Sequence, residues 1–289
     1  MFAVTGATGK VGGATARALL AAGKSVRVVV RDRAKGEEWL RLGCEVVVAD
    51  SGNAAELAQA FNGVEAAFVM LPPVFDPSPG FAEARGLIAA LRAALAQARP
   101  AKVAVLSTIG AEAAQPNLLN QLGLLERSFA DLPMPVTFLR AAWFMENAAW
   151  DVEPARNTGV IPSYLQPLDK PFPMIAAVDV GRTAAELLLE DCSGHRVVEL
   201  EGSRRVSPND IAEAFAKALG WPVKPEIVAR DNWEALFRAQ GMQHPAPRMQ
   251  MLDGFNAGWI DFAQRGANAR KGSISIGQAI AALVNNASP

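Results

Sequence analysis

The first 145 residues alternate between short apolar runs and longer segments with helical spacing. The apolar runs predict strands at residues 2–5, 25–30, 45–48, 66–71, 102–106 and 136–139. The intervening segments predict helices at 9–22, 34–42, 53–61, 81–98 and 118–130, with Asn53 as an N-cap. Continuously apolar strands separated by helices are typical of a parallel sheet that is covered on both faces. We therefore expect an α/β fold with a doubly wound parallel sheet of six or more strands.

The pattern changes after residue 150. Residues 151–175 are rich in Pro and Gly and predict loops with short strands. Ser207, Pro208 and Asp210 predict the start of a helix that ends at Gly220. The remaining pattern predicts helices at 179–189, 232–240, 246–264 and 275–284 and a strand at 196–200. We expect a doubly wound domain at 1–150 and a smaller α-rich lobe at 151–289, parts of which could return to the first domain.

Composition narrows the class of protein. The chain has 289 residues, of which 51% are hydrophobic, so it can bury a sizeable core and disorder is excluded. The formal net charge is −1 and no Lys/Arg block is present, which argues against direct nucleic-acid binding. No apolar run approaches the ~20 residues that span a bilayer, so we expect no membrane association. A strand begins at once at Met1–Thr5 without a preceding basic segment, which predicts a cytoplasmic protein without a signal peptide.

The cysteines and histidines give no candidate for a disulfide or a metal site. Cys44 and Cys192 are isolated, which predicts reduced thiols, and Cys44 opens an apolar run where a buried structural cysteine is expected. His195 and His244 are far apart and each lies in a turn-like context. We therefore expect no metal site.

A glycine-rich loop follows the first predicted strand and opens the first helix. It reads TGATGKVG from Thr5 to Gly12. In a Rossmann βαβ unit the first glycine permits a tight turn, the second admits a pyrophosphate, and the third packs the helix on the sheet. The N–H groups and dipole of the helix start attract phosphates. We expect a dinucleotide to bind Gly6, Ala7, Thr8, Gly9, Lys10, Val11 and Gly12. The alternative is a glycine turn that only joins strand to helix.

Two basic residues after the second strand favour NADP(H) over NAD(H). NAD-binding proteins usually hold an acid here for the ribose 2′-hydroxyl. This chain has Arg31 instead, with Lys35 one helical turn on. Arginine can pair with a 2′-phosphate through two hydrogen bonds. Asp32 could bind a ribose hydroxyl, which leaves NAD(H) open, and a solvated helix start would also explain Arg31 and Lys35.

Other residues at the ends of strands complete the predicted cofactor site, since ligands bind outside the carboxyl ends of such sheets. We expect Asp50 and Ser51 near the adenine, Met70, Leu71 and Pro72 along the ribose, and Ser107, with Thr108, near the nicotinamide. Each could equally be a plain turn residue.

Four stretches resemble the NmrA-like branch of the atypical short-chain dehydrogenases. They are TGATGKVGG at 5–13, VVVRDRAK at 28–35, AVLSTIGA at 104–111 and LRAAWFMEN at 139–147. The resemblance covers most of the chain and implies a Rossmann domain with a small C-terminal lobe. It implies either an NADPH-dependent reductase of quinones or dyes, or a redox sensor that binds dinucleotide without turnover. It also places the pyrophosphate on Gly6–Gly12, the 2′-phosphate on Arg31 and Lys35, and nicotinamide contacts on Ala141, Ala142, Trp143 and Phe144.

The chain departs from the wider dehydrogenase pattern. Short-chain dehydrogenases normally use a Tyr-x-x-x-Lys pair, in which Lys lowers the pKa of the Tyr. Tyr164 is the single tyrosine, residue 168 is Leu, and Lys170 is too far along the chain. Gly123 stands where related reductases often carry a His. Tyr164 is thus a weak catalytic candidate, retained as a group that could orient a carbonyl.

Two functions fit these features. One is an NADPH-dependent reductase of a quinone-like or conjugated small molecule, which can take its proton from water. Its pocket could use Trp143, Phe144, Met145, Trp150, Phe75 and Met174, with Glu146 and Asn147 as polar partners, although ordinary core packing explains each apolar residue equally well. The other is a non-catalytic dinucleotide sensor that regulates a protein partner. A homodimer is compatible with either.

Overall fold

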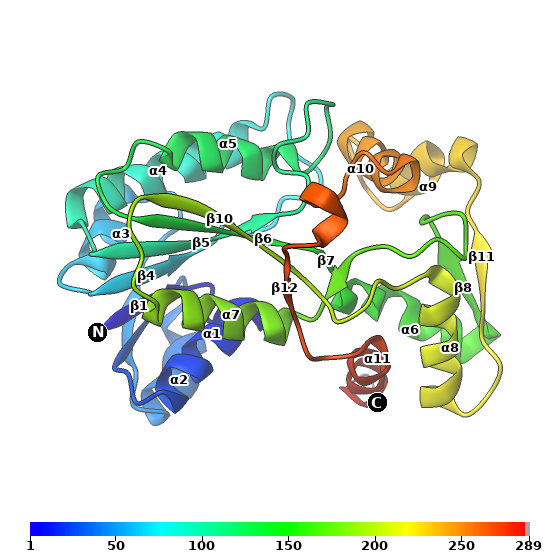
Figure 1. The fold of residues 1–289 in the computed structure, drawn as a ribbon, viewed down its shortest axis with the longest axis horizontal. Helices are drawn as coiled ribbons and strands as arrows, with labels where there is room; N and C mark the ends of the chain where they lie inside the picture. The colour runs from blue at the N-terminus through cyan, green and yellow to red at the C-terminus, as the bar shows by residue number, and fades with distance from the viewer. Residues whose placement is uncertain (287–289) are drawn as a thin grey trace. The chain divides into compact units, whose positions relative to one another are not determined.

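The computed structural model describes residues 1–286, which form two compact units (Figure 1). Unit 1 comprises Met1–Glu112, Leu119–Arg140 and Val178–Val198. Unit 2 comprises Ala113–Leu118, Ala141–Ala177 and the described chain from Glu199 onward.

An eight-stranded sheet organises the fold. Its strands lie in the order β12-β10-β6-β5-β4-β1-β2-β3. Their bounds are β1 (Phe2–Thr5), β2 (Val26–Val30), β3 (Glu45–Val48), β4 (Ala66–Val69), β5 (Lys102–Thr108), β6 (Val136–Ala141), β10 (His195–Glu201) and β12 (Arg270–Lys271). The first six have the doubly wound order 3-2-1-4-5-6, and β1 pairs in parallel with both β2 and β4. The predicted fold class is confirmed. The order in which successive strands are added to the sheet reverses between β1 and β4.

Helices cover both faces of the sheet in unit 1 (Figure 1). They are α1 (Lys10–Ala21), the 3₁₀ helix η1 (Arg33–Gly36), α2 (Glu37–Arg41), α3 (Ala54–Phe61), α4 (Ala82–Ala98), α5 (Asn120–Phe129) and α7 (Ala177–Leu189). One face carries α3, α4 and α5, whose buried side chains include Phe61, Leu91 and Phe129. The other carries α1 and α7, which approach closely at Gly181, where a Cβ would lie 2.7 Å from the Val11 oxygen. The central strand β4 is apolar throughout because both faces of the sheet are covered there.

Local sequence signals explain where several unit 1 elements begin. The Asn53 side chain accepts hydrogen bonds from the N–H groups of Ala55 (3.1 Å) and Glu56 (3.2 Å), so the predicted cap is confirmed. The single helix predicted at 34–42 is wrong, because η1 precedes the short α2. Gly36 joins them, and a Cβ there would lie 2.5 Å from a methyl group of Val46. Cys44 is buried, as predicted.

Unit 2 is rich in helices and carries two small parallel sheets, β8-β11 and β7-β9. Its strands are β7 (Trp143–Phe144), β8 (Val160–Ser163), β9 (Met174–Ile175) and β11 (Lys224–Ile227). Its helices are η2 (Met145–Asp151), α6 (Val152–Thr158), α8 (Pro208–Leu219), η3 (Arg230–Asn232), α9 (Trp233–Ala239), α10 (Ala246–Ala257), η4 (Ala263–Gly266) and α11 (Ile276–Asn286). None of the helices within residues 1–286 combines the length and apolar character that crossing a bilayer requires.

The unit 2 predictions had mixed outcomes. Helix α8 is confirmed, with Ser207 and Asp210 forming a reciprocal capping box. The loops predicted for 151–175 are wrong in part, since α6 forms there. The helix predicted to reach residue 264 ends at Ala257, because Gly258 adopts φ 87° and stops it. His195 opens β10 rather than lying in a turn.

Candidate functional site

The glycine loop after β1 is held in a shape that side chains would disrupt. Gly6 adopts φ +65°, and a Cβ there would lie 2.7 Å from the Met70 sulfur. The Gly9 N–H donates to the Gly6 carbonyl at 2.9 Å, which closes the turn. A Cβ on Gly12 would lie 2.3 Å from the Gly6 oxygen. The start of α1 therefore lies directly against the loop, between β1 and β4.

The N-terminus of α1 presents positive potential. Its N-cap, Gly9, has no side chain to cap the helix, and the first turn contains no acidic residue. The first i→i−4 bond runs from the Gly13 N–H to the Gly9 carbonyl at 2.9 Å. The N–H groups of Lys10, Val11 and Gly12 precede that bond, and such groups together with the helix dipole attract an anion. This geometry fits the predicted pyrophosphate position.

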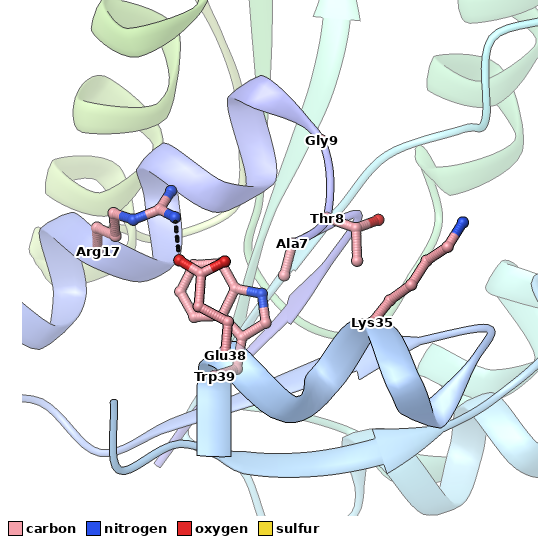
Figure 2. A pocket seen from close by; sticks show the side chains of 7 residues that line it. All are labelled: Ala7, Thr8, Gly9, Arg17, Lys35, Glu38 and Trp39. Carbon is pink, nitrogen blue, oxygen red and sulfur yellow. Dashed lines mark hydrogen bonds and ion pairs between the residues drawn. The ribbon is translucent and has the colours of Figure 1, made fainter. Parts of the chain in front are cut away.

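A cavity of about 400 Å³ opens beside this loop (Figure 2). Its lining residues are Ala7, Thr8, Gly9, Arg17, Lys35, Glu38 and Trp39. Four of the predicted cofactor residues, Ala7, Thr8, Gly9 and Lys35, are thus brought together. Arg17, Glu38 and Trp39 were not predicted. The available signal was the helical spacing that places Arg17 one turn after Gly13 on α1.

The cavity carries two cations and one carboxylate. Arg17 and Glu38 form an ion pair at 2.9 Å, and the Arg17 guanidinium lies 4.9 Å from the centre of the Trp39 ring. In Figure 2 the Lys35 amine lies to the right of Thr8, whereas Arg17 and Glu38 lie to its left. Both partners of the ion pair are more than half exposed, so the pair itself adds little stability and can be replaced. The lining therefore favours an anionic ligand.

The residues after β2 divide between the cavity and the surface. Arg31 is exposed and does not belong to the cavity lining. Asp32 caps η1, because its carboxylate accepts the Ala34 N–H at 3.0 Å. That capping role occupies one oxygen that a ribose hydroxyl would otherwise use.

Residues after β3 and β4 differ in what they contact. Asp50 shapes its own turn, with Oδ1 accepting the Gly52 N–H at 2.7 Å, and Ser51 follows it half-buried. The Met70 N–H donates to the Thr5 hydroxyl at 3.2 Å, which holds Met70 against the glycine loop. Leu71 is buried and Pro72 is half-buried. Met70 is therefore brought to the loop, whereas Asp50 is tied into a local turn.

Ser107, at the end of β5, belongs to a buried polar network. Its hydroxyl donates to Glu126 at 2.5 Å. Arg140 donates to both oxygens of Glu126, at 2.9 and 2.7 Å, and also pairs with Glu112 at 2.7 Å. Glu126 and Arg140, which lie on α5 and β6, were not predicted from the sequence. The Ser107 hydroxyl is thus oriented by a structural ion pair.

The four residues expected at the nicotinamide lie at the start of the second unit. Ala141 and Ala142 are buried, and the Ala142 N–H donates to the Leu200 carbonyl at 2.9 Å. Trp143 and Phe144 are half-buried and form β7. Trp143 packs edge-on against Phe255, with ring centres 5.2 Å apart. These contacts fix the backbone path of the segment.

The residues predicted for the apolar acceptor pocket differ in their exposure. Met145 and Met174 are buried in the core, whereas Trp150 is 83% exposed. Phe75 belongs to unit 1 and is 62% exposed. Of the polar pair, Asn147 is exposed, and Glu146 accepts the Ala177 N–H through both oxygens, at 2.9 and 3.0 Å. The role of Glu146 in this structure is to brace the start of α7.

Tyr164 lies in an aromatic cluster of unit 2. Its ring stacks on Phe237 at 5.2 Å and meets Trp233 edge-on at 5.8 Å. Burial raises the pKa of the Tyr164 phenol, and this rise is partly offset by Arg248 and by a hydrogen bond with Gln240. A raised pKa keeps the phenol protonated, so Tyr164 can donate a proton or a hydrogen bond.

The model of the NmrA-like family matches residues 1–253. This chain belongs to the NmrA-like family. The NmrA-like protein is 27% identical over 248 residues to the NAD(P)H azoreductase of Xenophilus azovorans, covering 84% of this chain and 82% of the azoreductase. It is 25% identical over 244 residues to quinone oxidoreductase 2 of Escherichia coli (strain K12), with coverage of 84% and 82%. The predicted family resemblance is confirmed.

Solved structures share the fold of this NmrA-like protein. The NADPH-dependent quinone oxidoreductase of Escherichia coli, solved with NADPH, superposes with a TM-score of 0.80 at 22% identity, covering 98% of this chain and 99% of the other. The triphenylmethane reductase of Citrobacter sp., solved with NADP(H), gives a TM-score of 0.80 at 20% identity with the same coverage. Identities this low establish the Rossmann-type architecture alone.

Proposed function

We propose that this NmrA-like protein is an oxidoreductase that binds NADP(H) and transfers hydride to a small conjugated acceptor such as a quinone. The observation that carries the proposal is the 400 Å³ cavity, where the glycine loop meets Lys35 and Arg17. The relatives named as an NAD(P)H azoreductase and a quinone oxidoreductase support the same cofactor and reaction class.

Different groups of the chain bind different parts of the dinucleotide. The N–H groups at the start of α1 bind the pyrophosphate, because the helix is uncapped and free of acids there. Lys35 and Arg17 bind the 2′-phosphate, and this phosphate takes the place of Glu38 beside the Arg17 guanidinium. The Trp39 ring, buried under Arg17, forms one wall of the cavity.

NADPH, when bound, supplies the hydride. The chain must then position an acceptor and exclude water from the reacting atoms. A quinone needs little further help, since the reduced product can take its proton from water. Tyr164 is the chain's protonated phenol for a more demanding carbonyl.

A specific observation favours a second function, that of a dinucleotide sensor without turnover. Tyr164 has Leu168 four residues on instead of a Lys, and the Tyr164 hydroxyl bonds to Gln240. The phenol therefore lacks the lysine of the dehydrogenase pair, and its pKa stays raised although Arg248 offsets part of the rise.

Ligand titration followed by an acceptor screen separates these proposals. The protein is titrated with NADPH and with NADH while its tryptophan fluorescence is measured. The variant Trp39→Phe removes the tryptophan that lines the cavity and so identifies the part of the signal that comes from this site. NADPH oxidation is then followed with naphthoquinones and an azo dye. Selective NADPH binding with turnover is the expected result. Binding without turnover of any acceptor selects the sensor, and failure to bind either nucleotide overturns both functions.

A further inference from the structure

Trp39 is the one aromatic residue that lines the cavity in the described part of the chain, and it is almost entirely covered. The residue is 2% exposed, and the Arg17 guanidinium carbon lies over its ring, 4.9 Å from the ring centre. Arginine packs on aromatic rings in this way because its guanidinium is planar and weakly hydrated. A flat ligand in the cavity therefore meets the Arg17 guanidinium more than the indole beneath it.

Gly13 leaves room for this guanidinium on α1. It lies one helical turn before Arg17, and a Cβ there would lie 3.1 Å from Arg17 Nη1 and 3.0 Å from the Ala7 carbonyl oxygen. A ring carbon of Trp39 would lie 3.8 Å away. Glycine in the interior of a helix is unfavourable relative to alanine. The helix carries this cost at the position where a side chain would crowd both Arg17 and the glycine loop.

The Arg17 guanidinium is held on two sides and still borders the cavity. It lies over Trp39, and its Nη2 donates to Glu38 Oε1 at 2.9 Å (Figure 2). The Arg17 side chain is nonetheless 56% exposed, and it belongs to the cavity lining. A planar cation that is held over a ring and along one edge presents its remaining face to a ligand as an oriented flat surface.

The cavity has the size and position for a nucleoside. Its volume of about 400 Å³ falls within the range of small-molecule pockets. The lining begins at the glycine loop, where we propose that the pyrophosphate binds, and reaches Arg17 about two helical turns along α1. Adenosine adjoins the pyrophosphate in a dinucleotide. Every base has a π-face, which stacks on a planar group whatever hydrogen bonds its edges make.

We propose that the outer face of the Arg17 guanidinium stacks on the adenine base of the dinucleotide, and that Trp39 and Gly13 are positioning residues that hold this face toward the cavity. The negative face of an aromatic ring attracts a cation, so the stack adds affinity without reading the edges of the base. The edge of Arg17 is left for the 2′-phosphate that displaces Glu38. This inference rests on the proposed function for the dinucleotide, but the stack is tested without turnover.

Calorimetric titration with three fragments separates the base from the phosphates. The fragment 5′-AMP carries the base, 2′,5′-ADP adds the 2′-phosphate, and inorganic pyrophosphate has no base. Arg17→Lys keeps the charge and loses the planar group. It should weaken 5′-AMP by about 5-fold and 2′,5′-ADP by at least as much, and leave pyrophosphate unchanged. Trp39→Leu removes the ring that holds Arg17 and should weaken 5′-AMP by about 2- to 5-fold, again without an effect on pyrophosphate.

Arg230 and Lys35 provide matched controls. Arg230 also lies 4.9 Å from the centre of a tryptophan ring, that of Trp233, but it does not line the cavity. Arg230→Lys should leave all three affinities unchanged, and Lys35→Ala should weaken 2′,5′-ADP alone.

Three results would overturn the stack. They are unchanged 5′-AMP affinity in Arg17→Lys, an equal loss of pyrophosphate affinity in that variant, and no binding of 5′-AMP by the unmodified protein. NADPH binding with turnover would then still support the proposed function. Conversely, Arg17-dependent binding of 5′-AMP in a protein that oxidises NADPH with no acceptor would support the stack and overturn the reductase.

Discussion

A Cβ placed on Gly12 would lie 2.3 Å from the carbonyl oxygen of Gly6. Real side chains do not approach a backbone oxygen so closely, so any larger residue at 12 must lift α1 away from the loop after β1. The N–H groups that face the proposed pyrophosphate belong to this same first turn. The close approach therefore ties the packing of the helix to the geometry of the ligand site.

Gly12→Ala should weaken NADPH binding by at least about 10-fold and destabilise the protein by about 1–3 kcal/mol through overpacking. Calorimetric titration and urea unfolding measure the two effects. Gly86→Ala is the control, because Gly86 is exposed in α4 and a Cβ there meets nothing within 4 Å. That control should gain about 0.5–1 kcal/mol and bind NADPH normally. Unchanged NADPH affinity in Gly12→Ala would remove the loop from the cofactor site.

Lys35→Ala and Arg31→Ala test which cation contacts the 2′-phosphate. Lys35→Ala should weaken 2′,5′-ADP binding by about 10-fold and leave 5′-AMP binding unchanged, since it removes one charge-assisted interaction. Because Lys35 lines the cavity and Arg31 does not, we expect Lys35→Ala to have the larger effect. Equal losses for both nucleotides would contradict a role in phosphate selection.

Glu38 should oppose NADPH binding, because its carboxylate must leave Arg17 when a phosphate arrives. Glu38→Gln should tighten NADPH by about 2- to 5-fold, in keeping with the small value of an exposed ion pair, and leave NADH unchanged. The matched control is Glu37→Gln, an exposed neighbour that does not line the cavity. A loss of NADPH affinity in Glu38→Gln would show that Glu38 is a ligand rather than a competitor.

The features predicted correctly from sequence are those that depend on local chemistry. Apolar runs such as Ala66–Val69 are strands because both faces of the sheet are covered, and that requirement is visible in the residues themselves. The Ser207 capping box and the glycine loop act over a few residues, so their spacing predicts their shape.

The features that were missed depend on how distant segments pack. Arg17 and Trp39 meet because α1 and α2 come together beside the loop, and no periodicity encodes that approach. Likewise, Glu126 and Arg140 are separated by a turn and a strand, and their pairing appears only once β6 lies beside β5. Helix α6 forms in a Pro-rich stretch where Pro154 lies early enough in the helix to be tolerated.

The Glu126–Arg140 pair should be a major determinant of stability. The Glu126 side chain is 12% exposed, whereas Glu112, the second partner of Arg140, is 48% exposed. Glu126→Gln should destabilise the protein by about 3 kcal/mol, because the amide removes the charge that pairs with Arg140 and replaces one of the two acceptor oxygens with an NH2 donor. Glu112→Gln should cost less than about 1 kcal/mol. Urea unfolding measures both, and equal costs would refute the dependence on burial.

Asp151 should contribute a loss of stability as the pH rises from about 4 to 7. Burial raises the pKa of the Asp151 carboxyl to about 7, whereas an unfolded aspartate has a pKa of about 3.9. Between these values the folded protein holds one more proton than the unfolded chain, so each rise in pH favours unfolding. The penalty is complete above pH 7 and absent below pH 4.

Asp151→Asn removes this titration and should stabilise the protein by on the order of 2 kcal/mol at pH 8, with no gain near pH 4. Urea unfolding at several pH values measures the difference. Asp169→Asn is the control, since Asp169 is exposed and its replacement should change stability little at any pH. A gain in Asp151→Asn that is independent of pH would show that repacking, rather than relief of a buried charge, stabilises the variant.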